Sequence, residues 1–254
     1  MGRDAPILEF DPDPVAVFEP HHVIDATPDA PKRAVLCFFS HVIDGLRDAG
    51  APVLFELTAA HGVHPVYGVD VAGEQIGVFH PGVGAPLAGA FLEEAIAHGC
   101  RKFMAVGTAG GLVPELTMGH VVVPTAAIRD EGTSYHYLPP GRSAAPSSEA
   151  VRALTDALDH HDISYVTGST WSTDGFYRET RKKLERRVAQ GCLTVEMEAS
   201  ALFAIAQFRG VPLAQVLTTS DDLSGDEWDD SGWGRDKDLR SVLFDAAAEA
   251  VCTL

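Results

Sequence analysis

Hydrophobic residues recur along the chain in two alternating patterns. Stretches with apolar residues at helical spacing are separated by short runs rich in β-branched and aromatic residues. The helical spacing predicts helices at 35–46, 87–96, 151–158, 179–190, 199–209 and 235–252. The β-rich runs predict strands at 52–57, 66–71, 75–79, 102–106, 120–128, 163–170, 192–195 and 211–219. Such alternation is typical of a mostly parallel or mixed sheet with helices on both faces.

The first 34 residues differ from the rest of the chain. They are rich in Pro, Asp and His and show no clear periodicity, so we expect an irregular entry segment with one short strand at 15–18. The remaining sequence contains no internal repeat and no linker-like stretch. A length of 254 residues suits one large α/β domain, and we expect a single domain over 1–254.

Charge and composition exclude several classes of partner. A formal net charge of −17 argues against a nucleic-acid-binding surface, because such a surface neutralises phosphates with Lys and Arg. The four cysteines show no CxxC spacing, and the start of the chain lacks a basic segment followed by an apolar one. No run of about 18 apolar residues is present to span a bilayer. We expect a cytoplasmic protein without a nucleic-acid or membrane partner.

In a sheet of this kind the ligand lies outside the carboxyl ends of the strands. The segments directly after the predicted strands therefore hold the candidate residues. These segments are 80–85, 107–112, 129–140, 171–178, 195–199 and 219–228.

Two of these segments carry weak signals. VGTAGGL at 106–112 offers small residues that let main-chain N–H groups approach an anion, with Thr108 adding a hydroxyl, but a tight turn is an equally good interpretation. The loop at 125–140 places Arg129 beside Tyr135 and other polar aromatics. Such residues line ligand clefts and protein interfaces alike, so composition does not separate these two roles.

Two other segments place carboxylates at strand ends. Glu196 and Glu198 lie where a strand meets an apolar helix, so they either accept main-chain N–H groups of that helix or hold the vicinal hydroxyls of a sugar. Met197 between them contacts a ligand or fills the core. Asp221 follows a buried strand and is either a helix N-cap or a general acid whose pKa is raised by burial.

Together, VGTAGGL, GHVVVPTAAIRDEGTSYHY, VEMEASALFAIAQFRGV and TTSDD resemble the nucleoside phosphorylase superfamily over roughly residues 75–228. This superfamily includes purine nucleoside phosphorylase, uridine phosphorylase and nucleosidases. The resemblance implies a single-domain three-layer α/β/α sandwich with a mixed, partly closed sheet. It also implies a homo-oligomer, either a dimer or a hexamer, that needs no cofactor or metal and uses inorganic phosphate as co-substrate.

The resemblance also implies roles for individual residues. Thr108 and its neighbour Gly107 match the phosphate-binding positions, and Met197 with Glu198 matches the ribose-binding pair, with Glu196 beside it. Asp221 matches the acid that purine-cleaving members place near N7 of the base. Phe176 in STDGFY matches the aromatic residue that lies against the base.

The sequence departs from the family pattern around phosphate. Ala105 stands where phosphorylases of this family have an arginine, and no copy of their GD…R signature is visible in 11–34. We therefore regard Arg129, Arg33 or a neighbouring subunit as the source of a compensating cation. Uridine phosphorylases have Gln and Arg where this chain has Thr180 and Lys182, whereas RDEGTSYHY is closer to that branch, so the base stays open.

These observations support three hypotheses. The first is a nucleoside phosphorylase that cleaves a purine or pyrimidine nucleoside with phosphate. The second is a hydrolytic nucleosidase, because attack by water needs no concentrated positive charge. The third is a non-catalytic nucleoside-binding or storage protein on the same scaffold.

Overall fold

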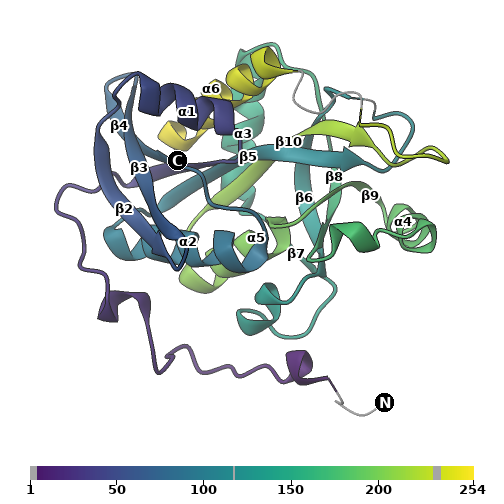
Figure 1. The fold of residues 1–254 in the computed structure, drawn as a ribbon, viewed down its shortest axis with the longest axis horizontal. Helices are drawn as coiled ribbons and strands as arrows, with labels where there is room; N and C mark the ends of the chain where they lie inside the picture. Colours follow the sequence, from purple (N-terminus) through teal and green to yellow (C-terminus); the bar gives the residue numbers. More distant parts are fainter. Residues whose placement is uncertain (1–4, 117, 231–235) are drawn as a thin grey trace.

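The computed structural model describes residues 5–116, 118–230 and 236–254 (Figure 1). The strands are β1 Arg33–Cys37, β2 Val53–Ala59, β3 Gly62–Val71, β4 Glu74–Phe79, β5 Lys102–Gly111, β6 Val121–Asp130, β7 Ser143–Ala144, β8 Tyr165–Thr173, β9 Cys192–Glu196 and β10 Leu213–Asp222. The helices are α1 Ser40–Asp48, α2 Ala85–His98, α3 Ser148–His160, α4 Arg181–Val188, α5 Ala199–Arg209 and α6 Lys237–Thr253. Four short 3-10 helices are η1 Pro6–Leu8, η2 Pro20–His22, η3 Thr133–His136 and η4 Phe176–Arg178.

All of these strands belong to one mixed sheet that closes partly on itself. The strand order is β10-β6-β8-β9-β5-β1-β4-β3-β2, and β7 pairs with β6. Because β10 also pairs with β5, the strands β5, β10, β6, β8 and β9 form a ring, from which β1, β4, β3 and β2 extend as an open sheet. This confirms the mixed, partly closed sheet expected from the resemblance.

Two hydrophobic layers cover opposite faces of the sheet (Figure 1). Alternate residues of β5 divide between them: Phe103 packs with α2 and α5, whereas Met104 packs with α3 and α6. The same alternation in β1 separates Leu36 from Val35. A strand buried on both faces reads as a continuous apolar run, which explains the sequence pattern of both strands. Within the described ranges no helix is both long and apolar enough to span a bilayer.

Most predicted elements are present, and three differ from expectation. The sequence pattern predicts a helix from Val35 onward, but residues 33–37 form β1 and the helix begins at Ser40, because a short apolar run does not distinguish a strand from a helix. The stretch 107–111 was predicted as a loop and instead continues β5. Residues 15–18 form no strand, and Val17 is fully exposed.

The parallel strands β5 and β10 bring their carboxyl ends together. Residues 103–111 of β5 pair in register with residues 213–222 of β10. The register shifts between Thr219 and Asp221, so Thr219 faces Ala109 while Asp221 faces Gly110, and Ser220 is the extra residue of a β-bulge. The bulge therefore determines which residue of β10 stands beside the end of β5.

Gly111 lies where these strands meet, and its missing side chain is a packing requirement. A Cβ atom there would lie 2.7 Å from the main-chain oxygen of Leu116. We expect Gly111→Ala to lower the free energy of unfolding by about 1–3 kcal/mol, because the backbone must move. Urea denaturation measures this. The control is Gly45→Ala in exposed helix α1, where a Cβ has nothing within 4 Å and we expect a gain of roughly 0.5–1 kcal/mol. Equal effects of the two substitutions would contradict the assignment.

Candidate active site

Glu196 holds the first turn of helix α5. Its Oε2 accepts hydrogen bonds from the main-chain N–H groups of Glu198 and Ala199, both at 2.6 Å. Its Oε1 accepts one from the Ser172 hydroxyl on the adjacent strand β8, at 2.5 Å. Both oxygens of this buried carboxylate are thus engaged within the protein, as a helix N-terminus requires. Of the two roles predicted for Glu196, these contacts favour the structural one.

Glu198 is buried beside Glu196, but its two carboxylate oxygens have different surroundings. Its Oε1 accepts the main-chain N–H of Gly84 at 2.5 Å, and Gly84 has a φ of 92°, which favours glycine. Among the described residues, Oε2 makes no direct hydrogen bond of ordinary length and angle, although the adjacent main chain of Met197 also stabilises the charged carboxylate. The glycine-rich stretch after β4 therefore fixes one oxygen of Glu198 and leaves the other without such a bond. Met197 between the two glutamates is half-buried.

A third buried carboxylate completes this cluster. Glu131 accepts hydrogen bonds from the Ser134 main chain and hydroxyl, and from the Ser200 hydroxyl at 2.9 Å. Burial raises the pKa of both Glu196 and Glu198, and repulsion between the carboxylates adds to the effect. Hydrogen bonds from Ser172 and from the main chain of Glu198 and Ala199 oppose this rise at Glu196, and main-chain hydrogen bonds from Gly84 and Met197 oppose it at Glu198.

Asp221 lies at the end of β10, in the bulge described above. The Ser220 hydroxyl donates to its Oδ1 at 3.0 Å, and the Trp228 indole N–H donates to its Oδ2 at 2.9 Å. The alternative of a helix N-cap is wrong, because α6 begins at Lys237 and is capped by the side chain of Asp236. The position of Asp221 beside Gly110 is compatible with the role of acid implied by the resemblance.

The predicted phosphate loop is a strand. Residues 107–111 pair with β10, and Gly110 and Gly111 also pair with β9, so part of their main-chain hydrogen bonding belongs to the sheet. Thr108 is half-buried and faces Thr218 across the ladder. Gly107 packs against Phe38, whose Cδ2 would lie 3.2 Å from a Cβ at that position.

The cations considered for phosphate lie elsewhere. Ala105 is fully buried in the core. Arg33 is the first residue of β1 and lies at the amino end of that strand, away from the carboxyl ends where the candidate residues gather. It forms an ion pair with Glu74 at 2.6 Å. The Arg129 guanidinium donates four hydrogen bonds. One goes to Ser134 Oγ, and the others go to the main-chain oxygens of Ser134, Leu138 and Pro139. Four of its five N–H groups are therefore engaged within its own loop. An anion-binding role for Arg129 stays a prediction, with one N–H to serve it.

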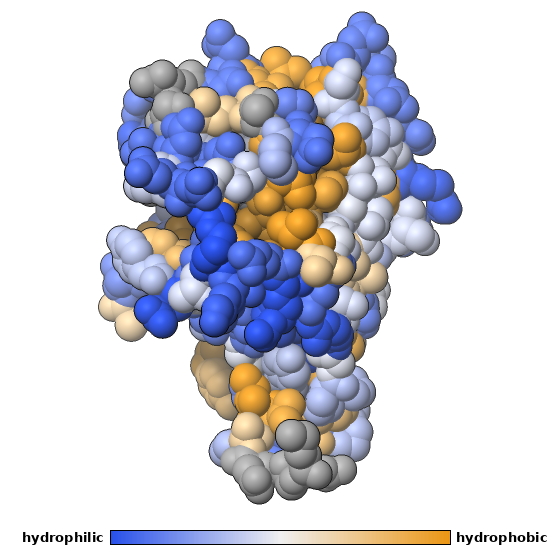
Figure 2. Space-filling model, turned by 90° about the vertical axis from the view of Figure 1, so that its right-hand side faces the viewer, coloured by the Kyte–Doolittle hydropathy of each residue, from blue (hydrophilic) through white to orange (hydrophobic). Residues whose placement is uncertain are grey.

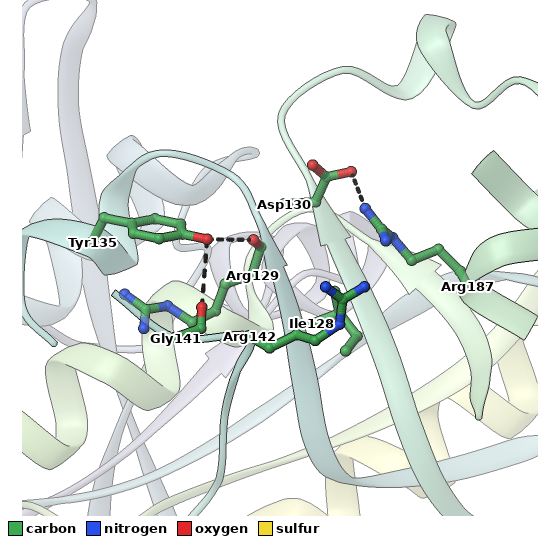
Figure 3. A pocket seen from close by; sticks show the side chains of 7 residues that line it. All are labelled: Ile128, Arg129, Asp130, Tyr135, Gly141, Arg142 and Arg187. Carbon is green, nitrogen blue, oxygen red and sulfur yellow. Dashed lines mark hydrogen bonds and ion pairs between the residues drawn. The ribbon is translucent and has the colours of Figure 1, made fainter. Parts of the chain in front are cut away.

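Arg129 also lines a polar pocket of about 370 Å³ at the edge where β7 meets β6 (Figure 3). Figure 3 shows Tyr135 on one side of Arg142 and the Asp130–Arg187 ion pair, at 2.8 Å, on the other. The Tyr135 hydroxyl donates to the main-chain oxygen of Arg129. Thr108, Glu198 and Asp221 do not line this pocket. The loop at 125–140 thus contributes Glu131 to the carboxylate cluster and Arg129 to a separate cavity.

Phe176 belongs to η4, directly after β8. Phe176 is 48% exposed, and its ring centroid lies 3.9 Å from that of Tyr177, so its predicted contact with a base stays a prediction. Figure 2 shows that apolar side chains, flanked by hydrophilic ones, gather on the side of the molecule that carries α4 and the end of β10.

Sequence reasoning missed Ser172, Gly84 and Trp228. Gly84 carried a signal, since it belongs to a glycine-rich stretch after a strand. Ser172 opens the STDGFY stretch, but only the sheet register shows that it lies beside Glu196.

Among the described residues, one group of side chains could hold a metal ion. His160, His161 and Glu249 place their ligand atoms within 4.8 Å of one another, and each histidine contacts Glu249, at 2.7 and 3.0 Å. The two histidines end α3 shortly before β8, and Glu249 reaches them from α6, so the group lies at the amino end of β8, away from the carboxyl ends that carry Glu198 and Asp221.

The family follows from comparison with known proteins. A profile of the phosphorylase superfamily matches residues 32–251. The chain belongs to this superfamily. The guanosine phosphorylase of Halorubrum lacusprofundi is 29% identical over 168 residues, which are 66% of this chain and 70% of that protein. The uridine phosphorylase of Treponema pallidum is 31% identical over 189 residues, 66% of this chain and 73% of that protein.

Solved structures show the same fold. Purine nucleoside phosphorylase of Toxoplasma gondii, in complex with immucillin-H, superimposes with a TM-score of 0.77 at 21% identity, over 91% of this chain and 96% of that one. Uridine phosphorylase of Vibrio fischeri superimposes with a TM-score of 0.76 at 22% identity, over 91% and 99%. The relatives are named as nucleoside phosphorylases, which places this superfamily member among the pentosyltransferases and leaves the base undecided.

The buried carboxylates predict a dependence of stability on pH. Because the pKa of Glu198 is higher in the folded than in the unfolded chain, its favourable contribution is complete below about pH 4.5 and is lost as pH rises through the folded pKa. We expect the wild type to lose stability between pH 5 and pH 9, and Glu198→Gln to lose about 1–3 kcal/mol less. Chemical denaturation at several pH values measures this difference. Glu115→Gln, at an exposed position, is the control and should follow the wild type. Parallel curves for all three proteins would contradict the assignment.

Proposed function

We propose that this member of the superfamily is a nucleoside phosphorylase that cleaves the N-glycosidic bond of a purine nucleoside with phosphate, releasing free base and a sugar 1-phosphate. The observation that carries the proposal is Glu198, a buried carboxylate with one oxygen fixed by Gly84 and the other available to a ligand. A carboxylate so placed suits the 2′ and 3′ hydroxyls of ribose, each of which can donate a hydrogen bond.

Cleavage of a glycosidic bond passes through a cation-like sugar, so three tasks must be performed. The sugar must be held, and Glu198 with Met197 does this. The departing base must be neutralised by a proton, and the carboxyl groups at the end of β10 supply it. A nucleophile must reach the opposite face of the sugar, and Thr108 at the end of β5 is the residue that holds phosphate there. Glu196 supports Glu198 by fixing the first turn of α5.

Three features support a purine over a pyrimidine. Asp221 stands at the strand end where the resemblance places the acid of purine-cleaving enzymes, and its two oxygens are positioned by Ser220 and Trp228. Thr180 and Lys182 occupy the places of the Gln and Arg of uridine phosphorylases. Phe176 offers a ring against which the larger purine stacks.

A hydrolytic nucleosidase is the second candidate, and a specific observation favours it. Phe38 packs against Gly107, and Ala105 is buried where an arginine of the family would stand. An apolar neighbourhood binds a dianion weakly and does not hinder attack by water. A phosphorylase with these residues would need a cation from another copy of the chain. We therefore include a homo-oligomer, cytoplasmic and without cofactor, in the proposal.

The nucleophile is tested by product analysis. Purified protein is incubated with purine and pyrimidine nucleosides, with and without inorganic phosphate, and the sugar product is identified. We expect phosphate-dependent release of purine base and of ribose 1-phosphate, with a high phosphate requirement because of the scarce positive charge. Free ribose formed at the same rate without phosphate would establish the hydrolase instead.

The sugar contact is tested by Glu198→Gln. A charge-assisted hydrogen bond contributes about 1.5–3 kcal/mol, so we expect kcat/KM for a ribonucleoside to fall roughly 10- to 100-fold. Circular dichroism should show a folded protein. The matched comparison is a 2′,3′-dideoxynucleoside, which lacks the hydroxyls and should lose much less. An equal loss with both substrates would rule out the proposed contact.

A further inference from the structure

Two histidines at the end of helix α3 converge on one carboxylate of helix α6. His160 Nδ1 lies 2.7 Å from Glu249 Oε1, and His161 Nε2 lies 3.0 Å from Glu249 Oε2. Adjacent positions of a helix point about 100° apart, so both rings reach the same carboxylate because they use different ring nitrogens. The ligand atoms of the three side chains lie within 4.8 Å of one another. Three metal-binding groups from two segments far apart in the sequence thus share one small space.

The backbone that carries these side chains is held in place by packing. Helices α3 and α6 lie against each other, and Leu158 and Ala250 belong to the same buried cluster. The end of α3 is closed by Asp162, which has a φ of 54°, and by the main-chain N–H of Ile163, which donates to the Leu158 oxygen at 2.9 Å. Ligands on rigid elements need little reorganisation to bind.

The side chains themselves remain open to solvent. The exposed fraction of the side chain is 72% for His160, 28% for His161 and 37% for Glu249, so an ion can enter from the surface. A tetrahedral zinc ion with bonds of about 2.0–2.2 Å needs ligand atoms roughly 3.3–3.6 Å apart. The widest separation in the group, within 4.8 Å, exceeds this by an amount that rotation of the exposed His160 ring removes.

The chemistry of the three ligands selects the kind of metal. Imidazole suits zinc and its transition-metal neighbours, whereas magnesium and calcium take oxygen ligands. Glu249 adds one negative charge to the two neutral rings. Three protein ligands leave the fourth position of a tetrahedral ion to water. The formal net charge of −17 also favours cations at the surface of this chain.

We propose that His160, His161 and Glu249 bind a zinc ion, which clamps the end of α3 to α6. The site lies at the amino end of β8, away from Glu198 and Asp221, so the ion is structural and takes no part in nucleoside cleavage. On binding, the ring hydrogen that each histidine directs at Glu249 moves through solvent to the other nitrogen of the same ring. The freed nitrogens and the carboxylate then donate their lone pairs to the metal.

Metal binding is tested by isothermal titration calorimetry on the full chain, free of any affinity tag. We expect one zinc ion to bind per chain and magnesium to give no signal. His160→Ala, His161→Ala and Glu249→Gln should each weaken zinc binding at least about 10-fold, because loss of a residue that only supports a metal ligand already costs roughly 10- to 100-fold. Wild-type affinity in all three variants, or no binding by the wild type, overturns the proposal.

The matched control is His61→Ala. His61 Nε2 and His64 Nε2 lie 2.9 Å apart in the hairpin of β2 and β3, so this pair offers two imidazoles at the surface. It tests whether zinc simply binds to paired surface histidines. We expect His61→Ala to keep the wild-type affinity. Equal weakening by His61→Ala and His160→Ala overturns the assignment of the site.

The clamp is tested by thermal unfolding. Zinc at one hundred times its Kd should raise the melting temperature of the wild type by about 5–10 °C. The double variant His160→Ala/His161→Ala should show no such rise, and Glu249→Gln, which keeps nearly the same volume, checks this independently. A rise in the double variant overturns the site, and zinc binding without a rise in the wild type overturns the clamp. Neither measurement uses nucleoside cleavage, so this inference is tested separately from the proposed function.

Discussion

The structure depends on how the buried amino terminus of α5 is satisfied. Eight consecutive residues of this helix, Ala199–Ala206, are buried, so its first N–H groups cannot turn to water. Glu196 accepts two of them and is itself held by Ser172 from the neighbouring strand. Once a carboxylate occupies that place, the chain turn that follows carries Glu198 into the same enclosed space. The position of the second buried carboxylate is therefore a geometric consequence of the helix cap.

The burial of three carboxyl groups in one cluster lowers the stability of the fold. Glu131, Glu196 and Glu198 are all buried, and hydroxyl and main-chain N–H donors surround them. These donors oppose the rise in pKa that burial and mutual repulsion cause, so the cluster retains part of its negative charge. A sugar that develops positive charge during cleavage gains from that environment, whereas the resting protein does not. The same feature that weakens the fold favours the transition state of the proposed reaction.

Much of the fold could be predicted from the sequence, because α2, α3, α5 and α6 have long apolar patterns bounded by clear breaks. The predictions were wrong where the local sequence pattern does not distinguish one structure from another. Val35 belongs to a strand because β4 and β5 flank it, and 107–111 extends β5 because β10 lies alongside, which are facts of tertiary pairing. At the site, Glu198 and Asp221 were found through motifs. The contact of Ser172 with Glu196 required the sheet register, the contact of Gly84 with Glu198 joins residues 114 positions apart, and the contacts of Arg129 required the path of its own loop.

The β-bulge at Ser220 shows how little separates one chemistry from another on this scaffold. Side chains alternate across a strand, so adding or removing a single residue at the end of β10 exchanges the side chain that stands beside Gly110. A hydroxyl and a carboxylate are neighbours in sequence there, and within the bulge the Ser220 hydroxyl donates to Asp221. A single-codon insertion or deletion would thus exchange an acid for a neutral hydrogen-bonding group without disturbing the ring of strands. Divergence among members of such a superfamily can proceed through steps of this size, with the core packing conserved.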